Sequence, residues 1–258
     1  MTVTTHPGAE SRTAPIYVWL AGACALFAFG GFAATYWLQL AAGTFVGGTP
    51  LLHLHATLFS AWTLLLLSQA WLGWRGQLEH HRAWGVAGVS LATAMLFVGM
   101  ALAIHSVNAY LADGHGDAAR AFFMLPFQGL FLFAVFFVAA LAKLAQPDWH
   151  KRLMIVATVV LLPAAAARIG FLIATGGGPG ARPGLAPPPP VALGINGALM
   201  ASVILLAGIA YDWRTRGRPH PAYLVGLAGL VGTALAGTWV SGTGAWLGFV
   251  DAMLGFAA

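Results

Sequence analysis

Histidine is the residue type whose number and placement in this chain could do chemistry. The 258 residues include nine histidines, compared with seven Asp and Glu residues together. Neutral imidazole is the commonest metal ligand in proteins, and it also binds haem iron. The one cysteine, Cys24, lies in an apolar run, so the sequence predicts neither a disulfide framework nor a thiolate metal site. The chemistry must therefore come from imidazole groups.

The composition decides where these histidines are placed. Only 7% of the residues are charged and 59% are hydrophobic, whereas about a quarter of the residues in a soluble domain are charged. The chain is therefore predicted to be an integral membrane protein, with the lipid bilayer as a partner. The net charge of +5 follows from membrane topology, and no nucleic-acid partner is predicted.

Seven apolar segments are long enough to cross a bilayer, which takes about 20 residues each. They cover residues 16–40, 51–74, 83–110, 119–144, 151–174, 191–211 and 222–250. We predict an all-α fold, a polytopic membrane helical bundle of about seven transmembrane helices, with spans two to five as a candidate four-helix core. Residues 1–15 are predicted as a disordered tail, and residues 16–258 as a single transmembrane domain with a Gly/Pro-rich outer loop at 175–190.

The basic residues predict the orientation of the chain. Nine of the twelve Lys and Arg residues fall on one side of the predicted spans, and three fall on the other: Arg120, Arg168 and Arg182. Because cytoplasmic loops are enriched in Lys and Arg, the N-terminus is predicted to be cytoplasmic and the C-terminus to lie outside.

With depth assigned, the histidines separate into two layers. The outer layer has one neighbouring arginine, Arg168, and comprises His53, His55, His105 and His115. The inner layer comprises His80, His81, His150 and His220. No ionisable residue is predicted at mid-membrane, which argues against a proton-coupled transporter. No lysine follows Lys151, which excludes a retinal Schiff base in the last span.

One hypothesis for the outer layer is a copper, zinc or iron site of an enzyme or metal-handling protein, with His53, His55, His105 and His115 as ligands. His53 and His55 point about 200° apart in a regular helix, so both could face the bundle only if the helix begins between them. The other interpretation of all these histidines is that they are polar residues at the membrane interface. No catalytic residue is predicted.

Two short motifs carry a resemblance. His81-Arg82-Ala83-Trp84-Gly85 fits the pattern H-R-x-x-G, and residues 150–154 (HKRLM) fit H-x-R-x-M. They resemble an uncharacterised family of bacterial multi-pass membrane proteins, which implies an inner-membrane location. Aligning Arg82 with Arg152 pairs His80 with His150, so the second–third and fourth–fifth spans could be duplicated hairpins.

More distantly, the layered histidines resemble the transmembrane di-haem b-type cytochromes of the ascorbate-ferrireductase type. The resemblance implies haem b held by His55 (or His53) with His105 at the outer side and by His81 (or His80) with His150 at the inner side. Arg168 would then pair with a haem propionate or a quinone. The leading prediction is a membrane redox protein that passes electrons to a quinone or a partner protein. A third hypothesis is a non-catalytic subunit of a larger respiratory or photosynthetic complex, without a cofactor.

Overall fold

The structure, a computed structural model, describes residues 14–175 and 187–256, and all elements in these ranges are helices. They are α1 (Ile16–Phe32), a π-helix (Ala33–Trp37), α2 (Leu38–Ala41), α3 (Pro50–Arg75), α4 (Leu78–Ala112), α5 (Gly116–Phe122), α6 (Met124–Ala142), α7 (Pro147–Val159), α8 (Pro163–Thr175), α9 (Leu193–Arg216), α10 (Pro221–Val240) and α11 (Gly244–Phe256). The predicted tail lies almost wholly outside the described residues, as do residues 176–186 of the predicted outer loop.

The predicted membrane fold is confirmed. Within the described residues, six helical segments are long and apolar enough to cross a membrane, and there are seven if the bent pair α7–α8 is one span. The first span combines α1, the π-helix and α2, and the fourth combines α5 and α6. These segments correspond to the seven predicted ones, although α4 begins at Leu78, five residues before the predicted start.

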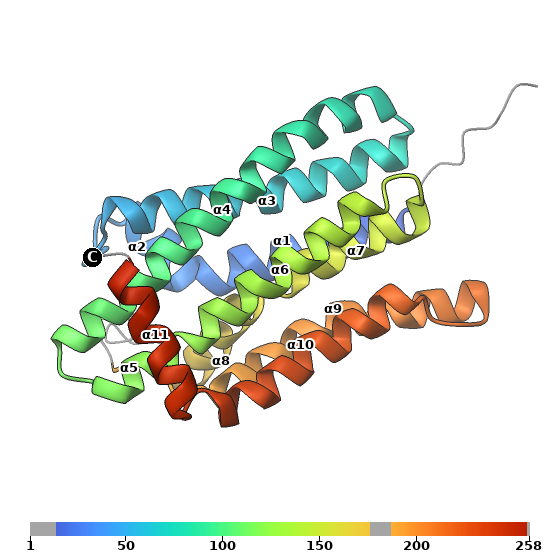
Figure 1. Cartoon of the computed structure of the whole chain (residues 1–258). Coiled ribbons are helices and arrows are strands. Elements are labelled where there is room, and N and C mark those ends of the chain that lie inside the picture. Colours follow the sequence, from blue (N-terminus) through green and yellow to red (C-terminus); the bar gives the residue numbers. More distant parts are fainter. Residues whose placement is uncertain (1–13, 176–186, 257–258) are drawn as a thin grey trace, which may run out of the picture.

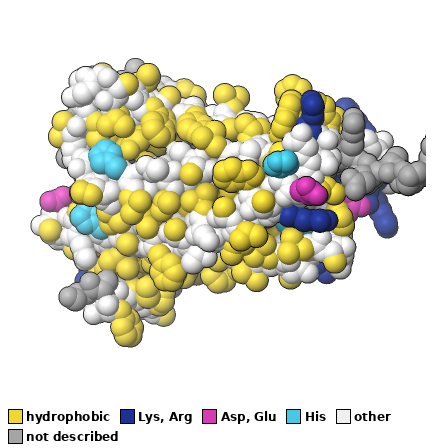
Figure 2. All heavy atoms as spheres, turned by 90° about the horizontal axis from the view of Figure 1, so that it is seen from above, with side chains coloured by type: hydrophobic (Ala, Val, Ile, Leu, Met, Phe, Trp, Pro, Cys, Tyr) yellow, Lys and Arg dark blue, Asp and Glu magenta, His cyan; other side chains and the backbone are white. Residues whose placement is uncertain are grey.

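Three helical hairpins, α3–α4, α6–α7 and α9–α10, turn at the same end of the bundle (Figure 1). We call this the inner end, after the predicted orientation, and it is defined by the turns at residues 76–77, 143–146 and 217–220. On the face shown in Figure 2, hydrophobic side chains cover the middle of the molecule and Lys and Arg side chains gather at one end. This distribution is the one expected of a bundle in a bilayer.

The centre of the bundle is closed by aromatic packing between the predicted spans two to five. Trp62 of α3 is 2% exposed, and its ring meets that of Phe133 of α6 edge-on at a centroid distance of 5.1 Å. Its indole Nε1 donates a hydrogen bond to Thr158 Oγ1 of α7 at 3.1 Å. Met95 of α4 belongs to the same core. These helices are not a separate unit, because α1 also packs on α3, α7 and α8.

The fifth span is broken between α7 and α8, which meet at an angle of 43°. Pro163 begins α8, and proline has no N–H to donate to the carbonyl four residues earlier. The intervening residues instead form short turns, with Leu161 N bonded to Thr158 O and Leu162 N to Val159 O. The bend thus lies at the position where proline removes a helical hydrogen bond.

The predicted seventh span, residues 222–250, is wrong in its second part. The helix α10 ends at Val240, and α11 crosses the end of the bundle opposite the inner end (Figure 1). Trp246 and Val250 of α11 pack in a second apolar cluster, and Asp251 accepts a hydrogen bond from Arg120 Nε at 2.7 Å. The two helices form one apolar segment in the sequence, because both are apolar and the break at residues 241–243 contains no proline.

Candidate functional site

Two of the predicted inner histidines occupy the same position in two different helices. His81 is the fourth residue of α4, and His150 is the fourth residue of α7. Both helices start at the inner end, each after a short turn that follows the preceding helix of its hairpin. The two imidazoles therefore lie about one turn inside their helices, whereas the predicted spans begin after them, at residues 83 and 151.

Each of these two rings is oriented by a hydrogen bond to the helix before it. His81 Nδ1 lies 3.2 Å from Gln69 O of α3, and His150 Nδ1 lies 3.0 Å from Ala140 O of α6. A carbonyl oxygen only accepts, so Nδ1 carries the proton in both neutral rings and Nε2 keeps its lone pair. Metal-ligating histidines are commonly held by such a bond on their other ring nitrogen.

The two rings also lie close to each other. The centroids of His81 and His150 are 6.4 Å apart, and the ring planes are almost perpendicular at 84°. Gln69, whose carbonyl holds His81, has a buried side-chain Nε2 without a hydrogen-bond partner among the described residues. The inner pair thus brings two imidazole rings together, each held through Nδ1 by the helix before it.

The structure corrects the register of the predicted repeat. Aligning Arg82 with Arg152 pairs His80 with His150, but the helix starts and the hydrogen bonds make His81 the counterpart of His150. His80 is exposed. The arginines also differ, because Arg82 is exposed and Arg152 is 2% exposed. The similarity between the two hairpins therefore lies in how each histidine reaches back to its preceding helix.

The outer histidines are not brought together as predicted. Among the described residues, no group of three or more His, Cys, Asp or Glu side chains could hold a metal ion, so the proposed cluster of His53, His55, His105 and His115 does not form. The helix α3 begins at Pro50, before both His53 and His55, so the two rings point in different directions. His105 is exposed on α4, away from such a cluster.

Each remaining outer residue has its own local contacts. His53 Nδ1 lies 2.8 Å from the hydroxyl of Tyr36, in the π-helix, whereas the ring of His55 stacks on Phe59 at 4.0 Å. The His115 ring lies against Tyr110 at 5.9 Å. The guanidinium of Arg168 donates to Ala164 O at 2.8 Å and lies over the ring of Phe32 at 4.4 Å. The predicted role of Arg168 toward a propionate or quinone stays a prediction.

A buried ionic cluster at the inner end was missed by the sequence analysis. Arg152 of α7 binds both carboxylate oxygens of Asp212 of α9 through Nε and Nη2. The Arg152 side chain is 2% exposed and that of Asp212 is fully buried. The guanidinium lies 5.5 Å from the ring centre of Tyr17 and 5.9 Å from that of Tyr223. An aspartate in the last turns of an apolar helix was the available signal, but the predicted sixth span stopped one residue short of it.

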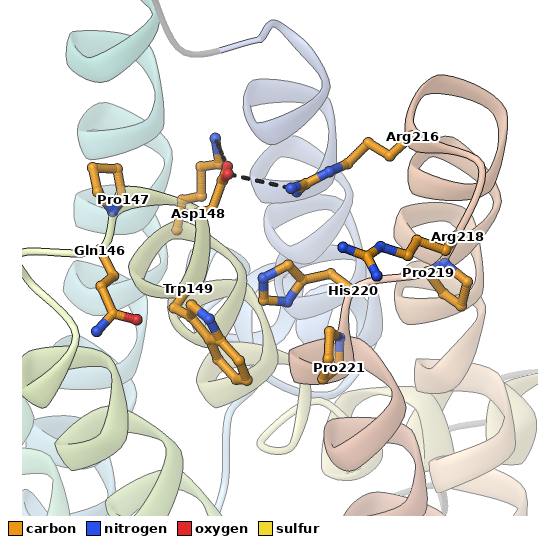
Figure 3. A pocket seen from close by; sticks show the side chains of 10 residues that line it. Gln146, Pro147, Asp148, Trp149, Arg216, Arg218, Pro219, His220 and Pro221 are labelled. Carbon is orange, nitrogen blue, oxygen red and sulfur yellow. Dashed lines mark hydrogen bonds and ion pairs between the residues drawn. The ribbon is translucent and has the colours of Figure 1, made fainter.

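A pocket lies beside this cluster, between the start of α7 and the turn from α9 to α10 (Figure 3). Its volume is about 730 Å³, and it is lined by residues 146–149 and 151 and by residues 216 and 218–221. Figure 3 shows Arg216 reaching toward Asp148 across the opening, with Nη2 at 3.4 Å from Oδ2. The wall opposite Asp148 includes the ring of His220, which packs edge-on against Trp149 at 4.6 Å.

Comparison with known protein families, with curated proteins and with solved structures finds no match for this chain. The resemblances to known families therefore stay predictions from the motifs.

Proposed function

We propose that this chain is a membrane redox protein that holds one b-type haem through His81 and His150 near the inner end of the bundle. The haem would supply one-electron chemistry. The chain would supply the two axial imidazoles, their orientation and a low-dielectric shell. The proposal keeps the inner pair of the predicted two and drops the outer pair, because His105 is exposed. The electron acceptor in this proposal remains a quinone or a partner protein.

The observation that carries the proposal is the separation of the two rings. Bonds between a metal and imidazole nitrogen are about 2.0–2.1 Å long, so two imidazoles that would bind one metal atom need ring centres no more than roughly 6 Å apart. The 6.4 Å between the His81 and His150 centroids agrees with this requirement.

The hydrogen bonds of the two rings support the same assignment. Nδ1 of each ring donates its proton to a carbonyl oxygen. Nε2 of the neutral imidazole is then the nitrogen whose lone pair is free to bind a metal. His220 differs in this respect, because its Nδ1 accepts a hydrogen bond from Ala222 N and the proton of the neutral ring then stays on Nε2. This difference supports His81 and His150, rather than the capping residue His220, as the ligands.

The pair His81 and His150 also supports one alternative cofactor, a single copper ion without a haem. Imidazole is a suitable ligand for copper as well as for haem iron. His81 and His150 would bind a copper ion through the same two Nε2 atoms that would bind the haem iron. The two cofactors differ in their optical spectra, so one experiment distinguishes them.

The test is a visible spectrum of the purified full chain, oxidised and then reduced, together with metal analysis, from cells supplied with haem and copper. A haem gives a Soret band that shifts on reduction, and copper without this band supports the alternative. We expect His81→Ala and His150→Ala each to lose the cofactor. His80→Ala, an exposed neighbour in the same turn, is the matched control and should retain it. His150→Met should keep a haem with a changed spectrum, because thioether is also an axial ligand.

A colourless and metal-free wild-type protein would contradict both cofactors and favour a non-catalytic membrane subunit. Full cofactor retention in His81→Ala and His150→Ala would contradict the assignment to this pair. If His105→Ala loses the cofactor and His81→Ala retains it, the cofactor site is on the outer side.

A further inference from the structure

The pocket at the inner end has walls from two segments that are distant in the sequence. The first wall is the start of α7 with the residue before it, and the second is the turn that joins α9 to α10. The two segments are connected by the contact between Arg216 and Asp148 and by the edge-on packing of His220 on Trp149 (Figure 3). The pocket is therefore part of the packed structure of the bundle.

The side chains that line the pocket carry a surplus of positive charge. Lys151, Arg216 and Arg218 face one carboxylate, Asp148, which leaves two positive charges in excess. Asp148 is itself shared, because Lys151 Nζ lies 2.8 Å and Arg152 Nη1 lies 3.1 Å from its Oδ1. Asp212 does not compensate this surplus, since it is buried against Arg152.

Arg218 is the cation with the most freedom to bind a ligand. Its side chain is exposed and points toward His220 in Figure 3, and within residues 14–175 and 187–256 it has no ion-pair partner. An arginine presents a planar fork of N–H donors that matches the oxygens of a phosphate. Arg216, whose contact to Asp148 is 3.4 Å long, can supply a second fork.

Two helices begin at this pocket and add to its preference for anions. Pro147 and Pro221 both line it and are the first residues of α7 and α10, which are 13 and 20 residues long. The N-terminal end of a helix carries a partial positive charge. These two ends reinforce the arginine and lysine charges.

The position of the pocket relative to the spans makes a lipid headgroup one available source of such an anion. Two of the membrane-spanning segments start at Pro147 and Pro221, so the pocket lies at the level of the lipid headgroups. Basic pockets between transmembrane helices on the cytoplasmic side are suited to the phosphates of anionic lipids. The half-buried Trp149 forms an apolar part of the wall, next to which a glycerol backbone would fit.

We propose that this pocket binds a phosphate group through Arg216, Arg218 and Lys151, presented by an anionic phospholipid headgroup or by a soluble phosphate compound. The site is distinct from the pair His81 and His150, and its occupation does not depend on a cofactor there.

The experiment uses the purified full chain in detergent and two probes. Native mass spectrometry counts bound phosphatidylglycerol, with zwitterionic phosphatidylcholine as the reference lipid. A thermal-shift titration measures the binding of inorganic phosphate through the rise in melting temperature. We expect the double variant Arg216→Gln/Arg218→Gln to bind at least about tenfold more weakly, because it loses charge-assisted hydrogen bonds from two guanidinium groups to the phosphate oxygens. The matched control is Arg214→Gln, an exposed arginine in the same turn of α9 that does not line the pocket, and it should bind as the wild type does.

Binding of phosphatidylglycerol without inorganic phosphate assigns the site to a lipid headgroup, and the reverse result assigns it to a soluble phosphate. If the wild type binds neither probe, or if Arg214→Gln weakens binding as much as the double variant, the proposal is overturned. Arg218→Gln alone breaks no ion pair within the described structure, and its melting temperature without ligand shows whether the fold is kept. His81→Ala should leave phosphate binding unchanged, which separates this test from that of the haem.

Discussion

The ion pair between Arg152 and Asp212 joins α7 to α9 inside the inner end of the bundle. Removing one partner of a buried ion pair leaves an uncompensated charge and costs about 3–5 kcal/mol. Arg152→Met leaves the fully buried Asp212 without a cation, so we expect a large fall in the free energy of unfolding. Asp212→Asn should cost less, because Arg152 keeps its contacts with Asp148.

The measurement is thermal unfolding in detergent, followed by tryptophan fluorescence, on both single variants and on Arg152→Met/Asp212→Leu. The double variant should be more stable than Arg152→Met, since it removes both charges and keeps the apolar volume. Additive losses in the double variant would contradict a coupled pair.

We expect His220 to make the stability of the bundle depend on pH. It is the N-cap of α10, where Nδ1 accepts a hydrogen bond from Ala222 N at 3.2 Å. The pKa of His220 is lowered below its ordinary value of 6.5, mainly by burial and secondly by the positive charge of Arg152. Below about pH 6.5 the unfolded chain therefore binds more protons than the folded chain. The stability that neutral His220 contributes is complete above this pH and is lost as the pH falls.

We expect the melting temperature of the wild type to decrease between about pH 7 and about pH 5, and to decrease less in His220→Asn. Asparagine caps a helix but does not titrate. His220→Ala lacks the cap and should lose about 1 kcal/mol at neutral pH. Equal pH slopes in wild type and His220→Asn would assign the dependence to other groups.

At the scale of elements, two glycines let neighbouring helices approach the start of α8. A Cβ on Gly31 of α1 would overlap the backbone oxygen of Ala165, and a Cβ on Gly197 of α9 would lie 2.6 Å from Pro163 O. Backbone atoms cannot move aside as a flexible side chain can. The bend after α7 thus places α8 between two helices that touch it through glycine, a common device in membrane bundles.

Gly31→Ala and Gly197→Ala should each destabilise the bundle by about 1–3 kcal/mol, the usual cost of overpacking. Gly22→Ala on α1 is the matched control, because no atom lies within 4 Å of a Cβ there, and its effect should stay within about 0.5 kcal/mol. The comparison is made by thermal unfolding in detergent. Similar melting temperatures for Gly31→Ala and Gly22→Ala would contradict the close approach.

At the scale of the whole molecule, the two histidine layers are separated by the thickness of the membrane. His81 and His105 lie in the same helix, 24 residues and therefore about 36 Å apart along its axis. This distance is close to the hydrocarbon thickness of about 30 Å. Which layer faces the cytoplasm follows from the predicted orientation and is directly testable.

Single introduced cysteines can measure the orientation, because Cys24, the only cysteine of the sequence, is fully buried. In a Cys24→Ala background, Gln77→Cys lies in the turn at the inner end and Asp113→Cys follows α4 at the opposite end. A membrane-impermeant maleimide added to spheroplasts should label Asp113→Cys at once and Gln77→Cys only after permeabilisation. The reverse pattern would contradict a cytoplasmic N-terminus.

The all-helical membrane bundle, the approximate spans and the two histidine layers could be predicted from the amino-acid sequence alone. These properties depend on hydropathy and charge summed along the chain, and they need no knowledge of which helices touch. The amino-acid sequence alone could not predict which histidines lie next to each other. A membrane helix is apolar on the sides facing lipid and protein alike, so periodicity does not reveal its inward face.

The folded structure was needed to show that His81 rather than His80 lies beside His150, that Arg152 pairs with Asp212 on α9, and that α11 lies across the end of the bundle. The first two contacts join residues more than 50 positions apart, and each depends on how a pair of helices is rotated about its axes. That rotation is set by packing between neighbours, such as the contacts of Trp62 and the glycines beside α8, which exist only in the folded chain.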